Sequence, residues 1–298
     1  MVRQYKIHTN LDGTDDKVWD VTNGKVRFYQ PSNLGLQSTN NIWQINGIGV
    51  MGTRSITQPQ IEFKLETFGE SLEENYQLMK DFINDILNQK FVTLEYQTEI
   101  FQVYADLALA DVTKTEGYGK NGTFSEKITF DIITKWYTYE NLTFEKIQNG
   151  QVLSGKSKIY GGTAPGSYKY VEGISYTYYG ESDIDRLSRW DIKDEIFSFM
   201  GILYPQLPKT PTGVRFLDDI GNEYTAIVFK TEELQDYILI NTDVNDETYQ
   251  GWNGTTSLNL FPVMDFERYR TRIIEKGQME LINLTKAEFK IKRKADFI

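Results

Sequence analysis

One long segment of this chain has the spacing of an amphipathic helix, and it stands among segments with the spacing of strands. In SLEENYQLMKDFINDILNQK, residues 71–90, apolar side chains recur every three or four positions, the period of one helix face. Ser71 and Glu74 form a capping box at its start. The apolar stripe consists of Leu72, Tyr76, Met79, Phe82, Ile83 and Ile86. We therefore expect one core-facing helix in an otherwise β-rich fold.

The segments around this helix alternate apolar and polar residues, the pattern of a half-buried strand. QIEFKLETF, residues 60–68, places Ile61, Phe63 and Leu65 on one side and charged residues on the other. In KVWDVTNGKVRFY, residues 17–29, an Asn-Gly turn between strand-like segments predicts a hairpin. Further strands are expected at 91–97, 101–112, 124–137, 168–180, 221–231, 235–243, 269–277 and 287–294.

The composition changes after Trp136, where a stretch rich in Gly, Ser and Lys begins. We place a domain boundary near residue 140, so that residues 1–140 and 141–298 form two β domains. Within the second domain, residues 183–211 show helical spacing early and three prolines late. We interpret that segment as an insertion in the β domain.

The composition also excludes several classes of protein. The chain has no cysteine, which excludes disulfides, thiolate metal sites and cysteine nucleophiles. A net charge of −10 argues against nonspecific binding to nucleic acid, because neutralising phosphates requires a basic face. The first residues lack an apolar region and no apolar run approaches a membrane span, so we expect neither a secretory signal nor a membrane segment. The 19 Tyr and 17 Phe argue for packed cores rather than disorder.

Two features could indicate chemistry, and both have simpler interpretations. GIGVMG, residues 47–52, matches the glycine pattern of dinucleotide-binding loops, but that loop needs a helix after it. TRSITQPQ follows instead, so we interpret residues 47–52 as a glycine-rich loop. His8 is the single histidine and would have to serve any catalytic triad or histidine metal centre. We expect an ordinary strand residue there, and we predict that the protein is not an enzyme.

The stretch NTDVNDETYQGWNGTT, residues 241–256, packs four oxygen-bearing side chains into five positions. An EF-hand loop that starts at Asp243 requires Gly at its sixth position and Glu at its twelfth, and neither residue stands there. A looser calcium site of Asp243, Asn245 and Asp246 stays open beside a solvated turn after a strand. Trp252 either offers a flat surface to a sugar or packs against its own sheet or a partner subunit.

The succession of these segments resembles the phage distal tail proteins, most closely those of lactococcal siphophages. The first half holds its lone helix and next strand in SLEENYQLMKDFINDILNQKFVTLEYQ and closes with FSEKITFDIITKWYTYE. The second half contains YILINTDVNDETYQGWNGTT and ends in ELINLTKAEFKIKRKADFI. The resemblance runs from Met1 to Ile298 and lies in the order of segments, since none of them is a short catalytic signature.

This resemblance implies a structural role in the virion. Residues 1–140 would form a hexameric ring with a fold like that of tail tube proteins, and residues 141–298 a galectin-like β-sandwich. The ring, assembled in the host cytoplasm, would join the tail tube protein to the tail-tip protein at the distal end of the tail. An extension at about 183–211 would hold receptor-binding protein trimers for host adsorption. Candidate partner contacts are Arg189, Trp190, Phe197, Phe199 and Trp252.

A second interpretation is a carbohydrate-binding or cell-wall-degrading accessory module. Galectin sugar sites use a cluster of His, Asn, Arg and Trp, and residues 141–298 contain no His. Trp252 alone does not replace such a cluster. We therefore expect a baseplate protein that assembles with itself, with no cofactor other than the calcium candidate, no specific nucleic acid and no membrane partner.

Overall fold

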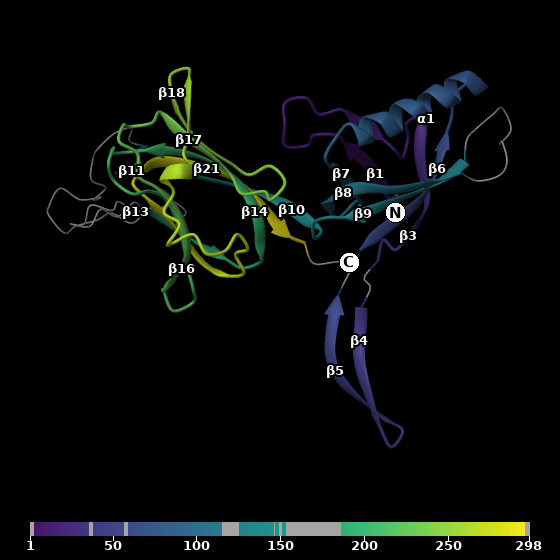
Figure 1. Cartoon of the computed structure of the whole chain (residues 1–298), viewed down its shortest axis with the longest axis horizontal. Coiled ribbons are helices and arrows are strands. Elements are labelled where there is room, and N and C mark those ends of the chain that lie inside the picture. The colour runs from purple at the N-terminus through teal and green to yellow at the C-terminus, as the bar shows by residue number, and fades with distance from the viewer. Residues whose placement is uncertain are drawn as a thin grey trace. The chain divides into compact units, whose positions relative to one another are not determined.

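The computed structural model describes residues 3–35, 38–56, 59–114, 125–145, 147–148, 151–152 and 186–295. The chain divides into two compact units, which we call unit 1 (residues 1–138 with 295–298) and unit 2 (residues 139–294). The division lies close to the boundary expected near residue 140. Strands dominate both units, so the predicted mainly β fold is confirmed (Figure 1). No helix among the described residues is long and apolar enough to cross a membrane.

The described residues of unit 1 form an antiparallel sheet and one α-helix, α1, at Leu72–Leu87. Its strands are β1 (Gln4–His8), β2 (Val18–Asp20), β3 (Val26–Ser32), β6 (Gln60–Thr67), β7 (Val92–Gln97), β8 (Gln102–Thr113) and β9 (Ser125–Ile132). They are ordered β2-β1-β7-β8-β9-β6-β3. Strand β10 (Tyr137–Glu145) begins in this unit, where Tyr137 pairs with Tyr104 of β8. A separate hairpin joins β4 (Ser38–Ile45) to β5 (Ile48–Ile56).

The core of unit 1 lies between the sheet and α1. The alternating segment at 60–68 forms β6 as predicted, and its Ile61, Phe63 and Leu65 are buried. The Phe28 and Phe63 rings stack with centroids 4.6 Å apart, and Phe82 of α1 meets Phe28 edge-on at 5.8 Å. The apolar face of the helix therefore closes one side of the sheet.

The predicted apolar stripe of α1 is correct in its second half. Ser71 caps the helix through its side chain as expected, and Phe82 is fully buried. Leu72 and Tyr76, by contrast, are exposed. Buried Asn75 takes the inward position in the first turns, so the stripe does not begin at the cap.

The hairpin expected over residues 17–29 is a turn without a paired ladder. Strand β2 pairs with β1, and β3 pairs with β6. One hydrogen bond joins the two sides of the turn, from the Phe28 N–H to the Val21 carbonyl at 2.7 Å. The Asn-Gly pair thus predicts the reversal of the chain but not the partners of the strands.

Unit 2 is a sandwich of two antiparallel sheets around one core. Its strands are β13 (Arg186–Ile192), β14 (Ile196–Pro205), β15 (Thr212–Leu217), β16 (Glu223–Phe229), β17 (Tyr237–Asn241), β18 (Thr248–Asn253), β19 (Thr256–Asn259), β20 (Gly277–Ile282) and β21 (Leu284–Lys294). One sheet is ordered β19-β18-β17-β14-β21-β10 and the other β13-β20-β15-β16. Phe199 and Phe216 meet across the core with ring centroids 5.9 Å apart. The remaining elements are the β11–β12 pair (Ile147–Gln148 with Gln151–Val152) and a 3₁₀ helix, η1 (Phe261–Val263).

The structure places residues 186–211 in this sandwich rather than in an extension; residues 183–185 lie outside the described ranges. Strand β13 pairs with β20, and β14 lies between β17 and β21. Ile196, Phe199 and Leu203 of β14 belong to the core. Apolar residues on both sides of β14 hide its strand alternation in the sequence, which is why the segment resembles an insertion.

Candidate functional site

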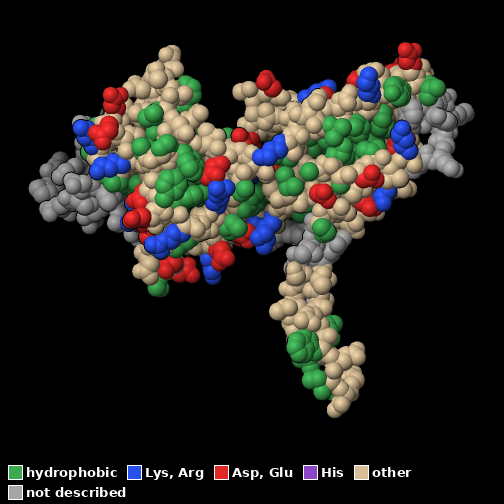
Figure 2. Space-filling view, in the orientation of Figure 1, with side chains coloured by type: hydrophobic (Ala, Val, Ile, Leu, Met, Phe, Trp, Pro, Cys, Tyr) green, Lys and Arg blue, Asp and Glu red, His purple; other side chains and the backbone are tan. Residues whose placement is uncertain are grey.

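The β4–β5 hairpin carries large apolar side chains that no described residue covers. Asn46 and Gly47 form its turn with φ values of 51° and 79°, the left-handed backbone that a two-residue hairpin turn requires. Figure 2 shows apolar side chains gathered on the hairpin. The exposed fractions lie between 48% and 70% for Ile42, Trp43, Ile45, Ile48, Val50 and Met51.

The register of the hairpin puts most of these side chains on one side. Trp43 lies opposite Val50 and Ile45 opposite Ile48, so these four share a face of the ribbon. Arg54 is the single charged residue in the sequence of the two strands. Since β4 and β5 pair with no other described strand, this face is an apolar surface without a core beneath it.

The glycine motif at 47–52 belongs to this hairpin. Gly47 lies in the turn and the following residues belong to β5, so the predicted loop is mostly strand. The next described element after β5 is strand β6 rather than a helix, which removes the structural context of a nucleotide-binding loop. An Asn-Gly pair between two apolar segments is the sequence signal that would have identified the hairpin.

A second apolar surface lies on the larger sheet of unit 2, on the side away from the core; we call it the outer face. Met200 of β14 pairs with Asn241 of β17, and Ile202 pairs with Leu239. Strands β18 and β21 continue the same face on either side. The outer face consists of the half-buried side chains of Met200, Ile202, Tyr204, Tyr237, Leu239, Asn241, Thr248, Gln250, Trp252, Lys286, Glu288 and Lys290.

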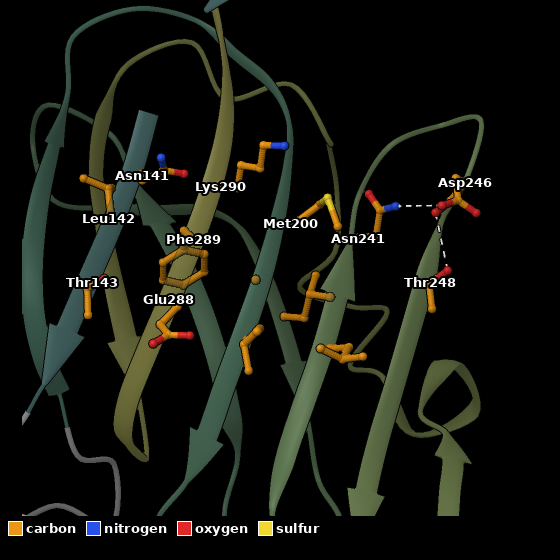
Figure 3. A pocket seen from close by; sticks show the side chains of 14 residues that line it. Asn141, Leu142, Thr143, Met200, Asn241, Asp246, Thr248, Glu288, Phe289 and Lys290 are labelled. Atoms are coloured by element: carbon orange, nitrogen blue, oxygen red, sulfur yellow. Dashed lines mark hydrogen bonds between the residues drawn. The ribbon is translucent and has the colours of Figure 1, made fainter. Parts of the chain in front are cut away.

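A cavity of about 510 Å³ lies over part of the outer face (Figure 3). The apolar part of its floor includes Leu142, Met200, Ile202, Leu239 and Phe289. Figure 3 shows polar side chains on both sides of this floor, on β10 and β21 at one side and on β17 and β18 at the other. The polar rim consists of Asn141, Thr143, Asn241, Asp246, Thr248, Glu288 and Lys290.

A row of aromatic side chains continues the outer face beside the cavity. The Trp252 and Tyr237 rings stack with centroids 6.0 Å apart at 14°. Tyr204 follows with its ring centroid 6.5 Å from Tyr237, and the Lys286 ammonium lies 5.4 Å from the Tyr204 ring. Trp252 therefore packs on its own sheet, and one face of its indole is taken by Tyr237 rather than left for a sugar.

The acidic loop at 241–256 is held together within unit 2. Asp243 is buried, and its Oδ2 accepts a hydrogen bond from the buried Lys292 Nζ at 2.9 Å. Its Oδ1 accepts from the Asn245 N–H, while Asp246 Oδ2 accepts from the Asn241 amide at 3.1 Å. Across the described ranges, no group of three or more His, Cys, Asp or Glu residues could hold a metal ion. The predicted calcium ligands thus serve as loop anchors in this structure.

His8 is a strand residue as expected, but its surroundings are unusual. It is 7% exposed, with Nδ1 2.7 Å from Asp16 Oδ2 and Nε2 2.8 Å from Glu95 Oε2. Lys6 Nζ also donates to Glu95 at 2.9 Å. Burial raises the pKa of Glu95, but the hydrogen bonds from Lys6 and His8 outweigh it and leave that pKa below its usual value. The cluster clamps β1 and β7 to the loop before β2.

The predicted partner contacts lie in different environments in the structure. Phe199 lies in the core of unit 2, so that prediction is wrong: in β14 its side chain points inward. Trp190 packs against the same core, and Phe197 is half-buried. Trp252 lies on the outer face, where a partner could reach it. The backbone of Arg189 pairs with the backbone of Glu280, and the structure does not describe the Arg189 side chain.

Known proteins match both units of the chain. Residues 4–133 match the family model for the distal tail protein, N-terminal domain, and residues 135–298 the model for the Dit C-terminal domain. The distal tail protein of Lactococcus phage p2 is 93% identical over 298 residues, all of both chains. A chain of the phage p2 baseplate in its activated conformation with Ca has the same identity and coverage, with a TM-score of 0.79. The crystal structure of SPP1 Dit, at 10% identity and 98% coverage of both chains, has a TM-score of 0.54 and shares the fold.

These similarities agree with the order of segments in the sequence. The predicted resemblance to distal tail proteins is confirmed over the full length. The galectin-like character of unit 2 stays a prediction. The chain belongs to the distal tail protein family.

Proposed function

We propose that this protein is a structural hub of a phage baseplate, a virion component at the distal end of the tail with no chemistry of its own. The observation that carries the proposal is the 93% identity, over the full length, to a chain solved within the phage p2 baseplate. The fold it shares with SPP1 Dit, described as a paradigm of a hub adsorption apparatus, supports the same role.

The hub we propose is a homohexameric ring formed by unit 1. The exposed hairpin supports this, because an isolated two-stranded ribbon is marginally stable and its apolar side chains gain from cover by another chain. A ribbon that enters a different surface of the next copy makes a heterologous contact, and such contacts produce rings when the rotation closes. The ring would carry the tail tube protein on one side and the tail-tip protein on the other.

Unit 2 is the part that we propose faces outward and holds receptor-binding protein trimers. The resemblance to the family implied that an extension at about 183–211 would do this, but the described residues of that segment belong to the sandwich. We therefore propose that surfaces of unit 2 as a whole, rather than that segment alone, contact the receptor-binding protein. A galectin-like sandwich remains the expected description of its fold.

Calcium enters the proposal at the level of the assembly. The phage p2 baseplate was solved with Ca. In this chain, Asp243 already pairs with the Lys292 ammonium at 2.9 Å, which leaves the loop at 243–246 poorly suited to a divalent cation. We infer that calcium acts between chains or on a partner. Calorimetry should show no heat of calcium binding to the purified protein that is lost in the Asp243→Ala variant. A heat of calcium binding that this variant lost would contradict the inference.

Size-exclusion chromatography with light scattering tests the hub. The expected result for the purified protein is the mass of a hexamer or of stacked rings. A monomer at micromolar concentration that binds cell-wall polysaccharide saturably would overturn the hub and support the carbohydrate-binding module instead. Ile220→Ser, at a position 83% exposed in unit 2, is the control for substitutions in the hairpin, and the mass of its oligomer should not change.

A further inference from the structure

We propose that His8 is a proton-dependent latch of unit 1. With a proton on both ring nitrogens, His8 holds the loop at residues 9–17 against strand β7, and loss of one of these protons frees the loop. The loop joins β1 to β2, which is the last strand at one end of the described sheet. All groups of the latch belong to unit 1, so it would act in a monomer as well as in the proposed ring.

The first support is the number of hydrogen-bond donors that the site requires. His8 is buried, with Nδ1 2.7 Å from Asp16 Oδ2 and Nε2 2.8 Å from Glu95 Oε2. An ionised carboxylate only accepts hydrogen bonds, whereas a neutral imidazole has one donor nitrogen and one acceptor nitrogen. A neutral ring would therefore direct a lone pair at one of the two carboxylates. Both contacts are satisfied together only when both ring nitrogens donate.

The second support is that both carboxylates act as acceptors. Burial raises the pKa of Glu95, but hydrogen bonds from Lys6 and His8 bring that pKa below its usual value, so Glu95 is ionised at neutral pH. Asp16 accepts with both oxygens, because Oδ1 takes the Asn10 N–H at 3.0 Å and Oδ2 faces His8. With a charged ring, two cations and two carboxylates compensate each other in this cluster, as buried charges require.

The remaining charges around His8 do not oppose a proton on its ring. The titratable groups on the neighbouring elements are Lys6 of β1, Asp16 and Lys17 of the loop, Asp20 of β2, Glu95 of β7, Tyr104 and Asp106 of β8, and Tyr137 of β10. Both lysines are paired, Lys6 with Glu95 at 2.9 Å and Lys17 with Asp85 at 2.5 Å. Asp106 accepts from the Thr93 and Tyr137 hydroxyls at 2.7 Å. The surroundings therefore contain no uncompensated cation among these groups.

Loss of a proton should open the contact with Asp16 rather than the one with Glu95. The Asp16 side chain is 20% exposed and the Glu95 side chain 6%. Glu95 also keeps Lys6 as a second partner at 2.9 Å. A buried carboxylate that faces a lone pair is costly, whereas a partly exposed one can turn to water. Asp16 would leave and release its hold on the Asn10 N–H, so the loop loosens as a unit.

The composition allows this titration to be assigned to one side chain. The chain has one His and no Cys. Histidine titrates ordinarily at about 6.5 and the α-amino group at about 7.7–8.0, and other side chains titrate ordinarily outside the range of about pH 6–9. The unfolded chain releases the His8 proton near pH 6.5. The latch therefore contributes its full stability below that pH and loses it as the pH rises.

Hydrogen exchange of the purified full-length protein tests the latch. Exchange is followed by mass spectrometry at about pH 6 and about pH 9 and corrected for the intrinsic pH dependence of amide exchange. Peptides over residues 9–17 report the loop, and peptides over residues 212–229 in unit 2 are the control. The corrected rate in the loop should be at least about tenfold higher at pH 9, the factor that corresponds to one pH unit. Equal corrected rates in the loop at both pH values would overturn the latch.

Two variants separate the proton from simple packing. In His8→Gln the amide cannot donate to both carboxylates, so the loop should exchange rapidly at both pH values. In Asp16→Asn the amide can donate to a neutral ring and still accept from the Asn10 N–H, so the loop should stay closed at both pH values. A response to pH that persists in either variant would assign it to another group and overturn the proposal. If thermal melting shows that His8→Gln unfolds early, Asp16→Asn decides.

The proton can also be observed on the ring itself. Protein labelled with ¹³C-histidine gives one imidazole signal, because the chain has a single histidine. At about pH 7.5 an ordinary histidine is mostly neutral, whereas the folded parent should show the chemical shift of a charged ring. Asp16→Asn should shift the signal toward the neutral form at the same pH. A neutral ring in the folded parent would contradict the latch, whatever the oligomeric state of the protein.

Discussion

The β4–β5 hairpin and the outer face of unit 2 are both apolar, and no described residue covers either of them, yet they differ in what lies beneath. The hairpin is two strands with exposed side chains and no core. The outer face belongs to a six-stranded sheet whose other side packs into the core of unit 2. Apolar side chains thus lie over a packed core on the outer face and over no core on the hairpin.

This difference indicates how each surface is used. A two-stranded ribbon is marginal on its own, so the hairpin needs a neighbouring chain to keep its conformation as well as to bury its side chains. The sheet under the outer face needs no such help, since core packing already fixes its strands. We therefore expect the hairpin to contribute to assembly, and the outer face to contribute to recognition.

The largest expected effect separates the two sides of the sheet that carries the outer face. Phe199→Ala should lower the free energy of unfolding of unit 2 by about 3–5 kcal/mol, because it leaves a cavity in the core. Leu239→Ala, on the outward side of the neighbouring strand, should cost about 1 kcal/mol or less. Urea denaturation of the full chain measures both. Equal losses would mean that the outer face is part of the core.

The next effect concerns the hairpin. Trp43→Ser should weaken association between chains by at least about 2 kcal/mol, roughly thirtyfold in Kd, because a buried Trp is a typical interface anchor. The free energy of unfolding of unit 1 should stay the same, since Trp43 is 64% exposed. Light scattering over a dilution series measures association, and urea denaturation measures the fold. A loss of stability with unchanged mass would place the Trp43 side chain in a core instead.

The sequence predicts the fold where local patterns and tertiary partners agree. Strand β6 has clean alternation, and α1 has a cap and a helical period, so both lie where expected. The Asn-Gly turn after β2 predicts a reversal, yet β2 pairs with the preceding strand β1 and β3 with β6 farther along the chain. In β14, apolar Met200 and Ile202 on the outward side obscure the alternation, which made a central strand resemble an insertion.

The candidate sites were less accessible to sequence reasoning, for a physical reason. The acids of the loop at 241–256 suggest a metal site until Lys292, 49 positions away in the chain, is seen to pair with Asp243. Val50 falls in the predicted glycine-rich loop and Trp43 in no expected strand, and their exposure follows because β4 and β5 pair with no other described strand. Burial and pairing over such separations are properties of the assembled fold, and no local period encodes them.

Acid should destabilise the sheet of unit 1 without changing the charge of the β4–β5 hairpin strands. The pKa of Glu95 is lowered in the folded chain, so its contribution to stability is complete above the unfolded value of about 4.3 and is lost as the pH falls toward the folded value. The sequence of the hairpin strands contains no Asp, Glu or His. Unfolding of unit 1 should therefore become easier below about pH 4.3, in part through Glu95.

Glu95→Gln provides the matched control for that effect. The variant should be less stable than the parent at neutral pH, since it loses the charge that holds Lys6 and His8. It should then lose less stability on acidification, because one carboxylate with a lowered pKa is gone. Urea denaturation at several pH values gives the slope for each protein. Parallel slopes would mean that other carboxylates govern the acid response.

The smallest effect should be that of salt, because neither surface depends on charges that bind another chain. With Arg54 as the single charge in the sequence of β4 and β5, association through the hairpin should be unchanged or slightly stronger at high sodium chloride. On the outer face, Lys286 and Glu288 pair with each other within unit 2, and exposed pairs of this kind contribute about 1 kcal/mol or less, so salt should change the stability of unit 2 little. Dissociation of the purified oligomer by salt would assign the contact between chains to charged surfaces and remove the hairpin from its centre.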